Sequence, residues 1–250
     1  MRQNEKYFFP ASVASVLFLT AIGKLCFILR QLTGSDIVFT GASNPFLRSL
    51  PYICYIGNLL CSRGAFVMAV CAIVYAVSYY GIKTAWKSAG LSLGCIAAGE
   101  GILFLYNITR NVVGTAAVQA WLLSALFELM YLCAMLAVTV GIAYFFAIRR
   151  FHAHHPNRLR RFAPMRAAFL AVFFEFLFQI VLLTAGSVVP FLVRYSNVTG
   201  AEILNILYDY GYYILWHLLV SFILAALLLK LLERFTGRLR PKDHREETAE

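Results

Sequence analysis

Long apolar runs, separated by short polar links, dominate the pattern of hydrophobic and polar positions in this chain. Six such runs cover about residues 7–29, 51–81, 88–106, 118–148, 167–193 and 203–232. A helix of about 20 apolar residues is long enough to span the hydrocarbon core of a bilayer. The pattern therefore predicts an all-α fold, a polytopic membrane helix bundle with six transmembrane helices.

The polar segments are too short to fold as a second domain. We expect a single six-helix transmembrane domain over residues 1–233 and a cytoplasmic, disordered tail over residues 234–250. The link 30–50 contains a helix start at Pro45 and could carry a short interfacial helix before Pro51 opens the second spanning helix.

Composition supports this prediction, and the distribution of charge gives the bundle an orientation. Hydrophobic residues make up 61% of the chain and charged residues 14%, whereas soluble domains carry about 25% charged residues. Basic residues gather at both ends of the chain and in alternate links, and the positive-inside rule places such segments in the cytoplasm. We therefore expect an integral protein of a bacterial cytoplasmic membrane with both termini cytoplasmic.

The net charge of +10 fits this topology and does not indicate nucleic acid as a partner. The link between the fourth and fifth runs forms a basic loop at the membrane surface, with the residues Arg149, Arg150, Arg158, Arg160, Arg161 and Arg166. Such a loop would contact anionic lipid at the cytoplasmic face. We expect the lipid bilayer and that anionic lipid as partners, together with either a partner protein or a second copy of the chain.

Charged and polar side chains inside the apolar runs are the candidate functional residues. At about 1.5 Å of rise per residue, the distance from the nearest cytoplasmic basic residue places four of them near the outer edge of the hydrocarbon: Lys24, Arg63, Glu128 and Asp209. The same count places four others at or closer to the bilayer middle: Glu100, Glu175, Gln179 and His217. The outer four could line a polar mouth, or they could pair with one another and with lipid headgroups.

A charge at the bilayer centre costs about 2.5–3.5 kcal/mol on insertion scales, so we expect the deeper residues to face a polar interior. Glu100 and His217 could relay protons there, with Glu175 or Gln179 beneath them. The alternative is a hydrogen-bonded lock between helices.

A stripe of small residues on the third apolar run predicts a closely packed neighbouring helix. Gly90, Gly94 and Ala98 recur at the spacing that lets two helices approach. Glu100 points to the other side of the same helix, so we expect this helix to have neighbours on both faces.

Two further stretches each allow two interpretations. The loop "FHAHHP" contains His152, His154 and His155, which could bind a metal, but its basic surroundings favour solvated histidines. The stretch "LYDYGYYILWHL" fits an aromatic belt at the membrane surface. It could also line a site for an organic cation, with Asp209 as the counter-charge. We expect neither a metal nor a cofactor.

The leading hypothesis for function is a small membrane transporter or permease subunit that moves a small solute, with protons coupled through Glu100 and His217. The first alternative is a non-catalytic membrane anchor or regulatory subunit of a larger complex. The second is an intramembrane hydrolase. The H-E-x-x-H and Walker motifs are missing from the sequence, which favours a role without catalysis.

Overall fold

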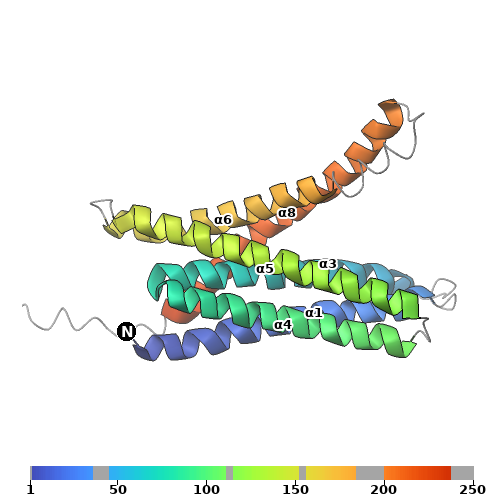
Figure 1. Cartoon of the computed structure of the whole chain (residues 1–250), viewed down its shortest axis with the longest axis horizontal. Coiled ribbons are helices and arrows are strands. Elements are labelled where there is room, and N and C mark those ends of the chain that lie inside the picture. Colours follow the sequence, from blue (N-terminus) through green and yellow to red (C-terminus); the bar gives the residue numbers. More distant parts are fainter. Residues whose placement is uncertain (1, 36–44, 111–114, 152–155, 184–199, 238–250) are drawn as a thin grey trace, which may run out of the picture.

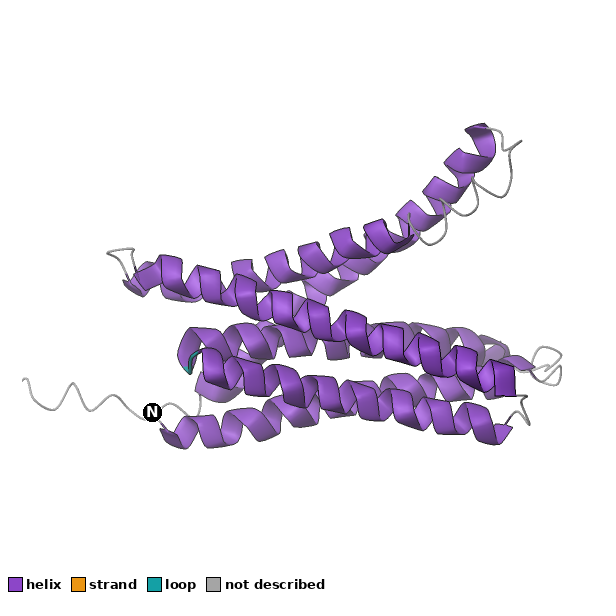
Figure 2. Ribbon diagram, in the orientation of Figure 1, coloured by secondary structure: helices purple, strands orange, loops and turns teal. Residues whose placement is uncertain are grey.

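The computed structural model of this chain is all-helical (Figure 1). It describes residues 2–35, 45–110, 115–151, 156–183 and 200–237, and helices account for nearly all of this part (Figure 2). The helices are α1 (Arg2–Ser35), α3 (Pro45–Tyr79), α4 (Ile82–Arg110), α5 (Thr115–Phe151), α6 (Pro156–Leu183) and α8 (Gly200–Gly237). Each of these six helices contains a segment long and apolar enough to cross a membrane. The predicted all-α fold and the six long apolar helices are thereby confirmed.

The start of α3 differs from the prediction. This helix begins at Pro45 and continues through Pro51, so the expectation that Pro51 opens the second spanning helix is wrong. Residues 36–44 of the link, which could carry an interfacial helix, lie outside the described residues. Proline suits the first position of a helix because its missing N–H would have no partner there. At Pro51 the helix gives up one backbone hydrogen bond but does not end. At the other end of the chain, α8 ends at Gly237, and the remainder of the predicted tail lies outside the described residues.

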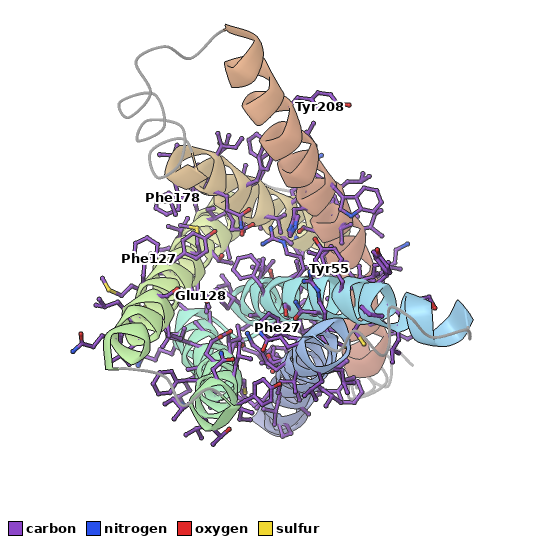
Figure 3. The ribbon with its side chains drawn as sticks, turned by 90° about the vertical axis from the view of Figure 1, so that its right-hand side faces the viewer. Phe27, Tyr55, Phe127, Glu128, Phe178 and Tyr208 are labelled. Carbon is purple, nitrogen blue, oxygen red and sulfur yellow. The ribbon has the colours of Figure 1, made fainter. Side chains whose placement is uncertain are left out.

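The helices run alternately between the two ends of the bundle. α1 begins and α8 ends at the left of Figure 1, which we call the near end. α3 and α5 begin at the opposite, far end, where the first part of α8 diverges from the other helices and carries the exposed Tyr208 (Figures 1 and 3). At the near end α3 is joined to α4 through Gly81, whose φ of 99° favours glycine.

α3 is the central helix of the bundle. It packs against the other five helices, which surround it in the order α1, α4, α5, α6 and α8 (Figure 3). Every residue from 64 to 77 is buried, and alanine and valine make up most of this segment. Small side chains let neighbouring helices approach closely. The segment therefore forms a closely packed core that extends from the middle of the bundle toward its near end.

Two glycines bring α1 close to its neighbours. A Cβ atom added at Gly23 would lie 2.8 Å from Oγ of Ser62 on α3. A Cβ atom added at Gly99 of α4 would overlap Cγ2 of Thr20 on α1. Both positions therefore require glycine if the three helices are to keep their spacing.

The predicted packing stripe on α4 is wrong. Gly90, Gly94 and Ala98 are exposed, and a Cβ atom added at either glycine would meet nothing within 4 Å. α4 packs instead through a second set of small residues on its other face: Ala85, Ser88, Ala89, Ser92 and Gly99. Both sets have helical spacing, but only the second lies on the same side as Glu100, where α1 and α3 are found.

Large apolar side chains cover the outside of the bundle. Among the most exposed are Phe18 at 64%, Leu123 at 67%, Met130 at 72% and Leu215 at 61%. Water would oppose such a surface, whereas lipid tails are as apolar as these side chains. The exposed surface thus agrees with the length and composition of the helices, and both indicate an integral membrane protein.

Candidate functional site

An ion pair between Arg63 of α3 and Glu175 of α6 lies in the middle of the bundle. Both terminal nitrogens of the guanidinium bind the carboxylate, Nη1 donating to Oε1 at 2.6 Å and Nη2 to Oε2. The Arg63 side chain is 10% exposed and that of Glu175 is 1% exposed. Burying a carboxylate this deeply is costly without such a partner.

Two further helices and one further turn of α6 contribute to this ion pair. The hydroxyl of Tyr131 on α5 donates to Glu175 Oε1 at 3.0 Å, and Nε2 of Gln179 donates to the same oxygen at 2.5 Å. On α8, Oγ of Ser221 accepts a hydrogen bond from Arg63 Nε at 2.6 Å and donates one to the carbonyl of His217. The network therefore ties α3, α5, α6 and α8 together at one level.

A cavity of about 580 Å³ borders this network. Side chains from α3, α5, α6 and α8 form its walls, and the polar ones are Asn58, Ser62, Arg63, Ser124, Glu128, Tyr131, Glu175, Gln179 and His217. Its volume is typical of a site for a small molecule. Along α5 the walls run from Ser124 to Leu132, so the cavity occupies the far half of the bundle and ends where the buried segment of α3 begins.

A second ion pair joins α1 to α4. The ammonium of Lys24 binds Oε1 of Glu100, and these side chains are 16% and 12% exposed. The pair lines a smaller cavity of about 350 Å³ between α1, α3, α4 and α5. Glu100 therefore lies inside the bundle, as predicted, but the expected second neighbour on the opposite, Gly94 face of α4 is wrong, because that face is exposed.

Thr20 gives the smaller cavity an unsatisfied polar wall. Its side chain is 3% exposed, and Oγ1 has no hydrogen-bond partner in the part of the chain that the structure describes. A buried hydroxyl without a partner costs about 1–3 kcal/mol. Since Thr20 lines the cavity beside Lys24 and Glu100, water or a polar ligand in that space would remove this cost.

The two cavities adjoin. Five residues of α3 and α5 line both: Asn58, Ser62, Phe66, Glu128 and Leu132. Glu128 is the charged residue among them, and in Figure 3 it lies on the side of α5 that faces the bundle, whereas Phe127 lies on the outer side. The polar interior of the far half is thus one region with two ion pairs and a further carboxylate.

The structure pairs residues that counting from the cytoplasmic basic residues places at different depths in the membrane. Lys24 of the outer group binds Glu100 of the deeper group, and Arg63 of the outer group binds Glu175 of the deeper group. His217 lines the larger cavity with Glu175, whereas Glu100 lines the smaller one. The direct contacts of Glu100 are therefore with Lys24, and the proposed Glu100–His217 relay would need the connection between the two cavities.

Other predicted residues lie outside this region or outside the described residues. Asp209 belongs to α8, but its side chain is not described. Arg166 is exposed on α6, and the side chains of the remaining residues of the basic loop are not described: Arg149, Arg150, Arg158, Arg160 and Arg161. The loop histidines are also outside the described part: His152, His154 and His155. Within the described residues, no three His, Cys, Asp or Glu side chains are grouped so that they could hold a metal ion.

The sequence analysis missed several neutral residues of the site: Thr20, Asn58, Ser62, Tyr131 and Ser221. Their spacing carries a signal. Asn58 and Ser62 are one helical turn apart, as are His217 and Ser221, and polar groups at this spacing share one face of a helix. Tyr131 carries the same signal, since Ser124, Glu128 and Tyr131 recur at i, i+4 and i+7 in the middle of an apolar run.

Comparisons of the chain with protein-family models, with curated proteins and with solved structures found no match.

Proposed function

We propose that this chain is a small membrane transporter or permease subunit that moves a small solute, with protons coupled to that movement. The adjoining cavities carry the proposal. They occupy the far half of the bundle, their walls contain both ion pairs and Glu128, and the buried segment of α3 closes them toward the near end. A cavity that is polar, large enough for a solute and blocked at one end is what one state of an alternating-access transporter requires.

The proposal includes an orientation in a bacterial cytoplasmic membrane. Lys83 and Lys87 are exposed in the first turns of α4 at the near end, and Arg166 is exposed in the early turns of α6. The positive-inside rule puts these residues in the cytoplasm. The near end is then cytoplasmic with both termini, and the cavities face the outside.

Proton coupling rests on Glu100 and its neighbours. Lys24 binds this carboxylate, and Glu128 lines the same cavity. A proton on Glu100 would weaken the pair with Lys24 and change the charge of the cavity. Glu100 is therefore the group through which pH would act on transport.

Uptake of labelled solutes into proteoliposomes with an imposed pH gradient tests the function. We expect pH-dependent uptake that is lost in Glu100→Gln and in Lys24→Met/Glu100→Gln, where the second variant leaves no buried lysine unpaired. Arg166→Gln, which changes an exposed residue, serves as the control. Uptake by both Glu100 variants that equals the wild type at every pH would contradict the role of Glu100.

A second candidate function is a membrane anchor or regulatory subunit. The Arg63–Glu175 network favours it, because four helices tied together by a fully bonded ion pair are also what a rigid scaffold needs. In that case the Glu100 variants would lower stability without affecting any uptake, and purification from native membranes would yield one stoichiometric partner protein.

A further inference from the structure

The charges in the walls of the two cavities do not balance. Lys24 is bound to Glu100, and Arg63 is bound to Glu175. Glu128 lines both cavities and forms no ion pair or hydrogen bond with any residue that the structure describes. Among the described wall residues, one carboxylate is therefore left without a cation.

An unpaired carboxylate within an apolar bundle is costly unless a cation or water reaches it. Glu128 belongs to the apolar segment Leu122–Phe146, and Leu126 and Met130, which flank it on α5, are largely exposed on the lipid-facing surface. The Glu128 side chain is itself exposed, and the two cavities that it lines are the polar surroundings within its reach. A positively charged ligand in either cavity would restore the balance of charge.

Aromatic rings surround the same space. Phe66 and Tyr131 line the larger cavity with Glu128, and Phe27 lines the smaller one. Ring faces attract cations, and they do so more strongly where water is scarce. Aromatic rings beside a carboxylate favour a cation with an apolar part, since a metal ion has no apolar surface to pack against the rings.

Other ligand classes fit the walls less well. An anion would have to displace Glu100 from Lys24 or Glu175 from Arg63, because each cation is already bound to a carboxylate. A divalent metal ion needs several ligands of the right type, and the described residues hold no group of three such side chains. A monovalent organic cation needs one counter-charge and aromatic contacts, and this site has both.

We propose that the adjoining cavities bind a small organic cation, an amine or quaternary ammonium compound, with Glu128 as its counter-charge and Phe66 and Tyr131 around its apolar part. Asn58, Ser62 and Ser124, which line the larger cavity, would accept hydrogen bonds from an ammonium group. This inference rests on the proposed transport function only in that the bound cation would be the transported solute.

Binding of three matched compounds to the purified full-length protein tests the proposal by calorimetry. Benzylammonium, benzyl alcohol and benzoate have similar size and carry positive, zero and negative charge. We expect saturable binding of benzylammonium and binding of the other two that is weaker by about tenfold or more, the factor that a single charge-assisted contact supplies.

Variants assign the binding to Glu128. Glu128→Gln should weaken benzylammonium binding by about tenfold or more, whereas Glu128→Asp, which keeps the charge, should change it by only about threefold. Glu247→Gln, which removes a carboxylate from the C-terminal polar segment, is the matched control and should bind as the wild type does. Retained binding by the monodisperse Glu128→Gln protein would overturn the proposal, and so would preferential binding of benzoate or no saturable binding of benzylammonium.

The uptake assay separates this inference from the proposed function. Glu128-dependent binding of benzylammonium without uptake would leave the cation site standing and contradict transport. Glu100-dependent uptake of a solute by a protein that does not bind benzylammonium would support transport and contradict the cation site.

Discussion

Arg63 of α3 and Glu175 of α6 form a two-pronged ion pair in the middle of the bundle, at positions 112 residues apart in the sequence. Arg63 also stacks its guanidinium over the ring of Phe66, with its central carbon 5.4 Å from the ring centre. Tyr131 and Gln179 donate further hydrogen bonds to the same carboxylate. These contacts make it the strongest candidate for a stabilising interaction within the membrane.

We expect Arg63→Met to destabilise the protein by about 3–5 kcal/mol, because it leaves the Glu175 carboxylate buried without its cation. Arg63→Met/Glu175→Gln removes both charges and should recover a substantial part of this loss. The free energy of unfolding in mixed detergent micelles measures both effects. Arg166→Met, at an exposed position of α6, is the control. If Arg63→Met were as stable as the wild type, the Arg63–Glu175 pair would contribute little to the free energy of unfolding.

The hydroxyl of Tyr131 should contribute less than the ion pair. Tyr131→Phe removes one of three hydrogen bonds to Glu175 Oε1 and keeps the stacking of the ring on Phe178, whose centre lies 5.7 Å away. We expect a loss of about 1 kcal/mol in the same unfolding measurement. Tyr144→Phe, at an exposed position of α5, should have no effect. A loss as large as that of Arg63→Met would mean that the hydroxyl, and not the charge, holds the network.

The length of the apolar runs predicted the six helices because the thickness of a bilayer sets the length of any helix that crosses it. The length of the apolar runs could not predict which charged residues form ion pairs. Counting residues from flanking basic side chains assumes untilted helices and a common boundary, and it placed Arg63 and Glu175 at different depths. The apolar segment of α3 extends from Ser49 to Tyr79, so Arg63 lies near its middle and reaches Glu175.

The choice between the two small-residue faces of α4 was also beyond sequence reasoning. Gly90 and Gly94 on one face and Ser92 and Gly99 on the other both have spacing that permits close packing. Only the three-dimensional arrangement shows that α1 crosses at Gly99. Hydroxyl groups on the packed face were the available hint, since polar side chains in a membrane helix usually face other helices.

The close contact between α1 and α4 predicts a contrast between two glycines of one helix. Gly99→Ala should cost about 1–3 kcal/mol, because the added methyl group would overlap Thr20 and push the helices apart. Gly94→Ala makes the same chemical change where nothing lies within 4 Å, so it should be neutral or slightly stabilising. Thermal unfolding of both variants in one detergent checks this. Equal stability of the two variants would show that α1 and α4 do not meet at Gly99.

If the cavities hold water and face the outside, a cysteine in their walls should react with a membrane-impermeant, charged thiol reagent added to intact cells. In a variant lacking the six native cysteines, Ser124→Cys in the wall of the larger cavity should be labelled. Leu136→Cys, on the same helix but 2% exposed and nearer the near end, should not, because charged reagents do not enter a closely packed core. Lys87→Cys, exposed at the near end, should react only after the membrane is permeabilised. Labelling of Lys87→Cys in intact cells together with protection of Ser124→Cys would reverse the proposed orientation.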